Sequence, residues 1–280
     1  MDNNPLRQYF RRPAVYLRLP SGGTDYAPGA IDMPDSGELP VYPMTAIDEI
    51  TTRTPDALYN GTALIELIKS CIPSIKDPWN ISSNDMDSIL IAMKAASGNE
   101  TMEIESECPS CKEVNNYGIN LIGMLSTFTP GDYTVPMTIG ELSFKFKPLR
   151  YKEMNGAALG QFEIQRVFYQ VENSESDEER NKITTAALEK LTLLTMEIVA
   201  KTIEYIEIPG SDTGPAARIT DQEFILDYLK SCDRNIYIKL RDHNTKLKSS
   251  SEIKPLQMKC ADCEHEYEQA FSLSPVDFFE

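Results

Sequence analysis

The sequence predicts an α+β fold that is predominantly helical, and three observations lead to this prediction. Several long segments repeat their hydrophobic residues every three to four positions, which is typical of amphipathic helices. Shorter segments alternate apolar and polar residues, which is typical of half-buried strands. Two Cys-x-x-Cys pairs, at 108–111 and 260–263, each follow an extended segment. The pairs predict a ribbon-like module that is assembled from two distant strand-knuckle-strand halves.

The composition is that of a folded protein, because 41% of the residues are hydrophobic and the chain holds 13 Tyr and 10 Phe. With 280 residues it can bury a substantial core without crosslinks. Its formal net charge of −16 repels phosphate backbones and anionic lipids, so we expect neither a nucleic-acid nor a membrane partner. No segment approaches the roughly 20 apolar residues of a membrane span, and no signal-like apolar run precedes the arginines near the N-terminus. We therefore expect a soluble protein that is made in a cytosol.

Residues 1–43 are predicted to form an extended arm with one short strand. Val15, Leu17 and Leu19 would share one face of that strand. A Pro-Ser-Gly-Gly turn follows at 20–23, and the remainder of the arm is rich in Pro and Gly. Because such an arm buries little surface of its own, we expect it to become ordered on a partner or on the rest of the chain.

Residues 44–100 are predicted to form a helical segment. One helix is expected after Gly61, with Thr62 as its N-cap and Pro73 at its end. A second helix is expected from the region of Ser82 to a stop at Ser97-Gly98.

Residues 101–148 are predicted to hold the first knuckle and β segments, including a strand within 140–148 that alternates Leu and Phe with Ser and Lys. Residues 149–250 are predicted to be a helical region inserted between the two half-sites, and 251–280 to hold the second knuckle. The inserted region would contain a helical hairpin and two shorter helices. The hairpin is expected at 149–171 and 180–206, with close packing at the small residues from Gly156 to Gly160, and the shorter helices at 221–231, capped by Thr220, and 233–248.

Four cysteines, Cys108, Cys111, Cys260 and Cys263, are the predicted metal ligands. In a reducing cytosol such pairs indicate metal ligands and not disulfides. One Cys-x-x-Cys loop supplies half of a tetrahedral zinc site, so the two pairs together predict one zinc-ribbon-like site. Four thiolates leave no open position, which predicts a structural and not a catalytic zinc. Two alternatives remain: two separate sites completed by other chains, or thiols without metal.

The other cysteines and both histidines are not expected to act chemically. Cys71 is interpreted as a core thiol and Cys232 as a thiol at a helix end. His265 lies just past the second pair and is placed outside the metal site, and neither it nor His243 belongs to a catalytic motif. We therefore predict no catalytic residues, no small-molecule substrate or cofactor site besides zinc, and no enzymatic activity.

Several segments resemble the baseplate hub subunit family of T-even-type contractile-tailed bacteriophages. They are YPMTAIDE at 42–49, TPDALYNG at 54–61, IKSCIP at 68–73 and NDMDSILIAMK at 84–94, together with both Cys-x-x-Cys pairs. The resemblance covers mainly residues 13–125 and 255–275, and the helices between them match only loosely.

The resemblance implies a structural component of a contractile tail baseplate or hub that docks other baseplate and tail proteins during assembly. Such a protein would be made in the host cytoplasm and would remain in the virion if it is retained. An alternative is a hub assembly chaperone that is absent from the finished tail. A third hypothesis, a zinc-ribbon nucleic-acid-binding factor, rests only on the cysteine pairs and is opposed by the acidic charge.

Overall fold

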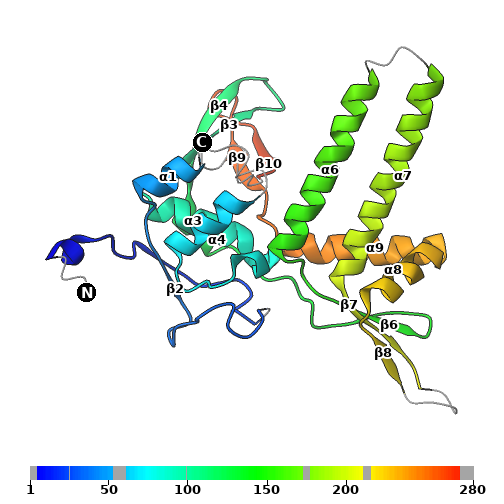
Figure 1. Ribbon diagram of the computed structural model, residues 1–280. Coiled ribbons are helices and arrows are strands. Elements are labelled where there is room, and N and C mark those ends of the chain that lie inside the picture. The colour runs from blue at the N-terminus through cyan, green and yellow to red at the C-terminus, as the bar shows by residue number, and fades with distance from the viewer. Residues whose placement is uncertain are drawn as a thin grey trace. The chain divides into compact units, whose positions relative to one another are not determined.

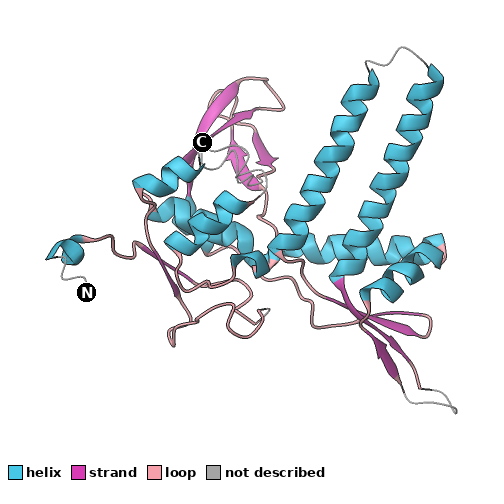
Figure 2. Ribbon diagram, viewed as in Figure 1, coloured by secondary structure: helices cyan, strands magenta, loops and turns pink. Residues whose placement is uncertain are grey.

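The computed structural model describes residues 5–24, 26–52, 61–98, 100–172, 177–210 and 216–271. The chain divides into two compact units, one formed by residues 1–130 and 251–280 and the other by residues 131–250. Helices and small antiparallel sheets occur in both units (Figures 1 and 2), so the predicted α+β class is confirmed. The predicted division into five segments stays a prediction.

The first unit has a helical core. Its helices are α1 (Ala46–Thr52), α3 (Thr62–Cys71), α4 (Ser83–Ala96) and α5 (Leu121–Leu125), with short 3-10 turns at η1 (Pro5–Tyr9) and η2 (Pro78–Asn80). Helices α3 and α4 each bury a broad apolar face, as their periodicity predicted. Leu64, Ile68 and Ile89 are fully buried there.

The starts of α3 and α4 were predicted to within one residue. Ser82 caps α4, since its hydroxyl oxygen accepts a hydrogen bond from the backbone N–H of Asn84. The N-cap of α3 is Gly61, which has a φ of 79° and no capping side chain, so the prediction of Thr62 as the cap is wrong. Glycine adopts this left-handed conformation without the steric cost of a Cβ atom.

The N-terminal segment packs on its own unit. Strand β1 (Val15–Leu17) pairs antiparallel with β2 (Leu39–Val41), and Leu17, Leu39 and Val41 are almost completely buried. The segment between these strands also reaches the core, because Ile31 forms a bridge with Ile75. Of the two alternatives predicted for the arm, the structure supports order on the rest of the chain for residues 11–24 and 26–43.

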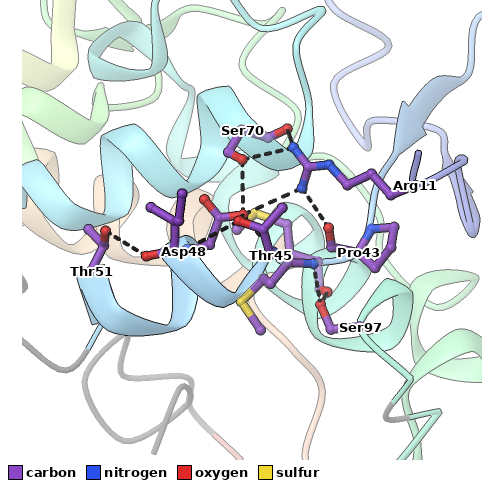
Figure 3. Close-up of polar contacts among 10 residues, drawn as sticks. Arg11, Pro43, Thr45, Asp48, Thr51, Ser70 and Ser97 are labelled. Carbon is purple, nitrogen blue, oxygen red and sulfur yellow. Dashed lines mark hydrogen bonds and ion pairs between the residues drawn. The ribbon is translucent and has the colours of Figure 1, made fainter. Parts of the chain in front are cut away.

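Arg11 anchors the start of this segment (Figure 3). Its guanidinium donates to the carbonyl oxygens of Pro43 (2.6 Å) and Ser70 (2.7 Å) and to the Ser70 hydroxyl (2.9 Å), and it pairs with Asp48 (3.4 Å). The same Asp48 oxygen accepts from the N–H (2.7 Å) and hydroxyl (2.8 Å) of Thr45. Asp48 therefore completes a capping box with Thr45 at the start of α1 and also holds the arginine.

Asp85 provides a second anchor on α4. Its carboxylate is fully buried and accepts hydrogen bonds from the N–H and hydroxyl of Ser21 and from the hydroxyl of Tyr26. The turn predicted at 20–23 is therefore fixed to α4 by a buried carboxylate, which is stable only with such partners.

The second unit contains a four-stranded antiparallel sheet in the order β5-β6-β7-β8. Its strands are β5 (Met137–Ile139), β6 (Leu142–Phe146), β7 (Ile203–Ile208) and β8 (Ala217–Ile219), and its helices are α6 (Tyr151–Glu172), α7 (Asp177–Thr202), α8 (Gln222–Ser231) and α9 (Arg234–Ser251). Phe144, Phe146, Ile203 and Leu240 lie in its buried core.

Two local predictions in this unit are corrected. The helix expected to reach residue 206 ends at Thr202, and β7 begins at Ile203. The buried residues Ile203 and Ile206 are three positions apart, a spacing that also fits a helix. However, residues 203–208 are rich in β-branched Ile, and this segment pairs with β6. The cap of α8 is Asp221 and not Thr220, since the Asp221 carboxylate accepts from the N–H groups of Glu223 and Phe224.

The predicted helical hairpin consists of α6 and α7, which stand side by side in Figure 1. A Cβ atom built on Gly160 would lie 3.1 Å from Cδ2 of Leu194, so this position is closely packed. A Cβ atom on Gly156 would meet nothing within 4 Å. The prediction of close packing is therefore confirmed at Gly160 and wrong at Gly156.

Candidate metal centre

Two hairpins from distant parts of the chain meet in the first unit. Strand β3 (Thr101–Glu107) pairs with β4 (Val114–Asn120), and β9 (Leu256–Lys259) pairs with β10 (Glu266–Gln269), both antiparallel. The hairpins lie side by side in Figure 1. Each carries one Cys-x-x-Cys pair in the turn between its strands.

The two turns have the same backbone geometry. In each, the N–H of the first cysteine donates to the carbonyl five residues later (2.9 Å), and the N–H four residues later donates to the carbonyl of that cysteine (3.0 Å). The residue four positions after the first cysteine has a positive φ, 66° for Lys112 and 60° for Glu264. The hydrogen-bonded residues are Cys108, Lys112 and Glu113 in the first turn and Cys260, Glu264 and His265 in the second.

This geometry places all four predicted cysteines in one cluster. Sγ of Cys108 lies 3.7 Å from Sγ of Cys263, and Sγ of Cys111 lies 3.6 Å from Sγ of Cys260. All four sulfur atoms lie within 4.8 Å of one another. Both of these contacts cross between the hairpins, so neither pair forms the cluster alone.

The cluster has the dimensions of a tetrahedral metal site. A Zn–S bond is about 2.3 Å long, so two sulfurs at adjacent vertices of a tetrahedron lie about 3.8 Å apart. The Cys108–Cys263 and Cys111–Cys260 sulfur separations are close to this value, and they exceed the roughly 2.05 Å of a disulfide. Four sulfur ligands in this arrangement suit zinc or iron. The residues present therefore fit a metal ion.

The backbone favours the thiolate form at one ligand. The pKa of Cys108 is lowered to about 7, chiefly because the backbone N–H of Cys111 donates to its sulfur and also because Ser110 does so. Cys108 and Cys260 are buried, whereas Cys263 is exposed at the rim. A thiolate is the form that binds metals.

A layer of polar side chains joins the hairpins beside the sulfurs. Asn115 donates to Sγ of Cys260 (3.5 Å) and to the carboxylate of Asp262 (3.2 Å), which orients the second turn. Hydrogen bonds of this kind around metal ligands fix their positions. Asn115 was not predicted, and the only signal in the sequence is its place on the strand that leaves the first knuckle.

Hydroxyl groups continue this layer away from the cysteines. The buried Ser106 donates to the side chain of Gln269 (2.8 Å) and accepts from the hydroxyl of Tyr267 (3.0 Å). Tyr117 donates to the carbonyl of Lys259 (3.2 Å). Its pKa is raised, chiefly by the Tyr267 hydroxyl, whose oxygen lies 3.3 Å away. Each contact crosses from one hairpin to the other.

The remaining thiols and histidines lie outside the cluster. Cys71 is buried in the core and burial raises its pKa to about 12, which is unsuitable for a reactive thiol. Burial also raises the pKa of Cys232, which is the C-cap of α8. The backbone carbonyl of His265 accepts the hydrogen bond from the N–H of Cys260 in the second turn. Its ring lies nearly parallel to that of Tyr267, with the ring centroids 6.3 Å apart.

A zinc site needs at least three Cys, His, Asp or Glu side chains that lie close together. Within the described part of the chain, the four cysteines are the only such group. In the same residues, every helix is too short or too polar to span a bilayer.

The fold and the site define a class: an α+β protein with small antiparallel sheets whose distant hairpins meet at a four-cysteine cluster able to hold a metal. The sequence model of a family described as T4 bacteriophage base plate protein matches residues 32–280, and the chain belongs to this family. The resemblance predicted from the sequence is therefore confirmed at the level of the family. Comparisons with curated proteins and with solved structures gave no match.

Proposed function

We propose that this protein is a non-enzymatic structural component of the contractile tail baseplate or hub, and that it docks other baseplate proteins during assembly. The match to the base plate family over residues 32–280 carries this proposal. A protein with this role would be made in the host cytoplasm and would remain in the virion tail.

Exposed apolar side chains support docking to other proteins. Tyr9 and Phe10 are 77% and 56% exposed, and η1 projects from the rest of the first unit in Figure 1. Ile47 and Ile50 on α1 are 75% and 68% exposed. Aromatic and aliphatic groups of this kind commonly become buried at protein interfaces.

Charge argues against nucleic acid as the partner of the ribbon. The unit that contains both hairpins has 11 Lys and Arg against 24 Asp and Glu, a net charge of −13. A nucleic-acid interface needs a basic surface that releases counterions. The acidic unit is therefore suited to protein partners with basic or apolar surfaces.

We further propose that the four cysteines hold one structural zinc ion. The sulfur separations fit tetrahedral zinc, and four ligands from the protein leave no position for a substrate or water. When bound, the metal would join residues 101–120 to residues 256–269 through bonds that stabilise only the folded chain.

Native mass spectrometry of the purified chain tests the zinc proposal. One zinc per chain is expected, and Cys263→Ser should lose it. Cys232→Ser is the matched control, because this thiol lies outside the cluster. A folded chain without metal, or with iron at the site, would contradict the assignment.

Quantitative mass spectrometry of purified tails tests the structural role. A structural subunit is expected in a fixed ratio to the other baseplate proteins. If the chain is abundant in assembly intermediates and absent from finished tails, the structural role is wrong and the assembly chaperone takes its place.

A further inference from the structure

The second unit begins and ends at the same place. A Cβ atom built on Gly131 would lie 2.9 Å from the carbonyl oxygen of Leu247 and 3.3 Å from Oγ of Ser250, both near the C-terminal end of α9. A side chain would not fit against that carbonyl, so glycine allows the entering chain to lie directly against the leaving helix. We call residues 131–133 and 247–250 the junction.

Each side of the junction is attached to the core of the second unit. Tyr133 packs against the buried cluster around Leu240, and so does Leu247 from α9. Lys145 on β6 donates to the carbonyl of Thr134 (2.7 Å), which fixes the entering segment to the sheet. All of these contacts join residues of this unit to one another, so the junction forms when the unit folds.

The junction shortens the loop that separates the two halves of the metal site. Cys111 and Cys260 are 149 positions apart in the chain. About 20 of these positions precede Gly131, and about 10 follow Ser250. When the junction has formed, an effective loop of about 30 residues therefore joins the two half-sites. Ends that lie together in this way are typical of a domain that is inserted into another.

We propose that the folded second unit raises the metal affinity of the four cysteines by holding their two halves close together. The inference rests on the proposed zinc site and concerns how that site is assembled. Closing a flexible loop costs more entropy as the loop grows, so reducing 149 residues to about 30 favours closure about tenfold. Metal binding gains the same factor, because it closes this loop. The second unit therefore acts on a site that contains none of its residues.

Two insertions of the same flexible segment into the full-length chain test this proposal. About 60 Gly and Ser residues between Pro130 and Gly131 lie outside the junction and lengthen the effective loop from about 30 to about 90 residues. The zinc affinity should then fall about fivefold, measured by competition with a chelator of known zinc affinity. The same segment between Gly140 and Glu141, at the exposed turn from β5 to β6, lies inside the unit that the junction closes. This second insertion should leave the zinc affinity unchanged.

A third variant opens the junction without changing the length of the chain. Leu240→Asp places a carboxylate in the buried core of the second unit and should unfold it. Hydrogen exchange should show lost protection in residues 131–250 and retained protection in α3 and α4, and the zinc affinity should fall about tenfold. Val135→Asp is the matched control, because Val135 is 67% exposed in the same unit. The control should bind zinc like wild type.

Equal zinc affinities in the two insertion variants would overturn the proposal. A loop of the full 149 residues would be lengthened alike at either place, with a loss of affinity below about twofold. An unchanged zinc affinity in Leu240→Asp, with its second unit unfolded, would overturn the proposal as well. A wild type that binds no zinc would contradict the metal site itself, whereas the outcomes above leave that site in place.

Discussion

At the scale of single residues, the N-terminal segment depends on a few buried polar contacts. Only 11% of the Asp48 side chain and 28% of the Arg11 side chain are accessible to solvent. Charges at such positions need their partners, since losing one leaves the other buried and uncompensated. The single tryptophan, Trp79, lies in η2 of the same unit and can report its unfolding.

Asp48→Ala should lower the free energy of unfolding of the first unit by about 3 to 5 kcal/mol, because Arg11 loses its counter-charge and the backbone N–H of Thr45 loses its acceptor. Urea unfolding followed by Trp79 fluorescence measures this. Arg18→Ala is the control: the Arg18–Glu38 pair is exposed, and its loss should cost no more than about 1 kcal/mol. Equal effects in the two variants would contradict the anchoring role of Asp48.

His243 should make the second unit less stable in mild acid. Burial lowers its pKa, and Lys246 lowers it further. The unfolded chain therefore takes up the proton first, so stability is lost as pH falls through the unfolded value of about 6.5 and changes no further below the folded pKa.

Thermal unfolding by circular dichroism between pH 8 and 5 measures this loss. The His243 ring lies 5.0 Å from that of Phe146, so His243→Phe keeps an aromatic ring at the site without the titrating group. This variant should lose less stability than wild type between these pH values. An identical pH dependence in both proteins would rule out His243 as the cause.

At the scale of elements, the hairpin of α6 and α7 distinguishes two helical glycines. Gly156→Ala should raise the free energy of unfolding by roughly 0.5 to 1 kcal/mol, because the helix gains a better former and the space is open. Gly160→Ile should lower it by about 1 to 3 kcal/mol, because its side chain would displace Leu194. Chemical denaturation compares the two, and a stabilising Gly160→Ile would show that the helices can separate freely at this point.

The two knuckles show how far an element follows from its local sequence. Both contain Cys-x-x-Cys after a strand, and both close with the same pair of backbone hydrogen bonds. The β segments around them were therefore largely predictable. Strands β5, β7 and β8 were not, because each is short or resembles a helix in its pattern, and pairing across the sheet decides its conformation.

At the scale of the whole molecule, the cysteine cluster joins segments that are about 150 residues apart in the chain. If it holds a metal, removal of the metal should release the two hairpins from each other. Loop closure over such a length is entropically costly, and metal bonds offset that cost only in the folded state.

Hydrogen exchange measured by mass spectrometry after chelation should show faster exchange in residues 101–120 and 256–269. The second unit, residues 131–250, should keep its protection, because the cluster contains none of its residues. Cys260→Ser should reproduce the pattern without chelator, and Cys71→Ala should not. Uniform loss of protection in both units would contradict the assignment of the cluster to one unit.

The sequence by itself determined the α+β class, the main helices, the cysteine ligand set as a prediction, and the base plate family. These follow from periodicity, spacing and local motifs, which operate over a few residues. Only the tertiary structure decided that Arg11 meets Asp48, that Asn115 orients Cys260, and that Gly131 lies beside the end of α9. Such contacts depend on how distant segments pack together, and no local pattern along the chain encodes them.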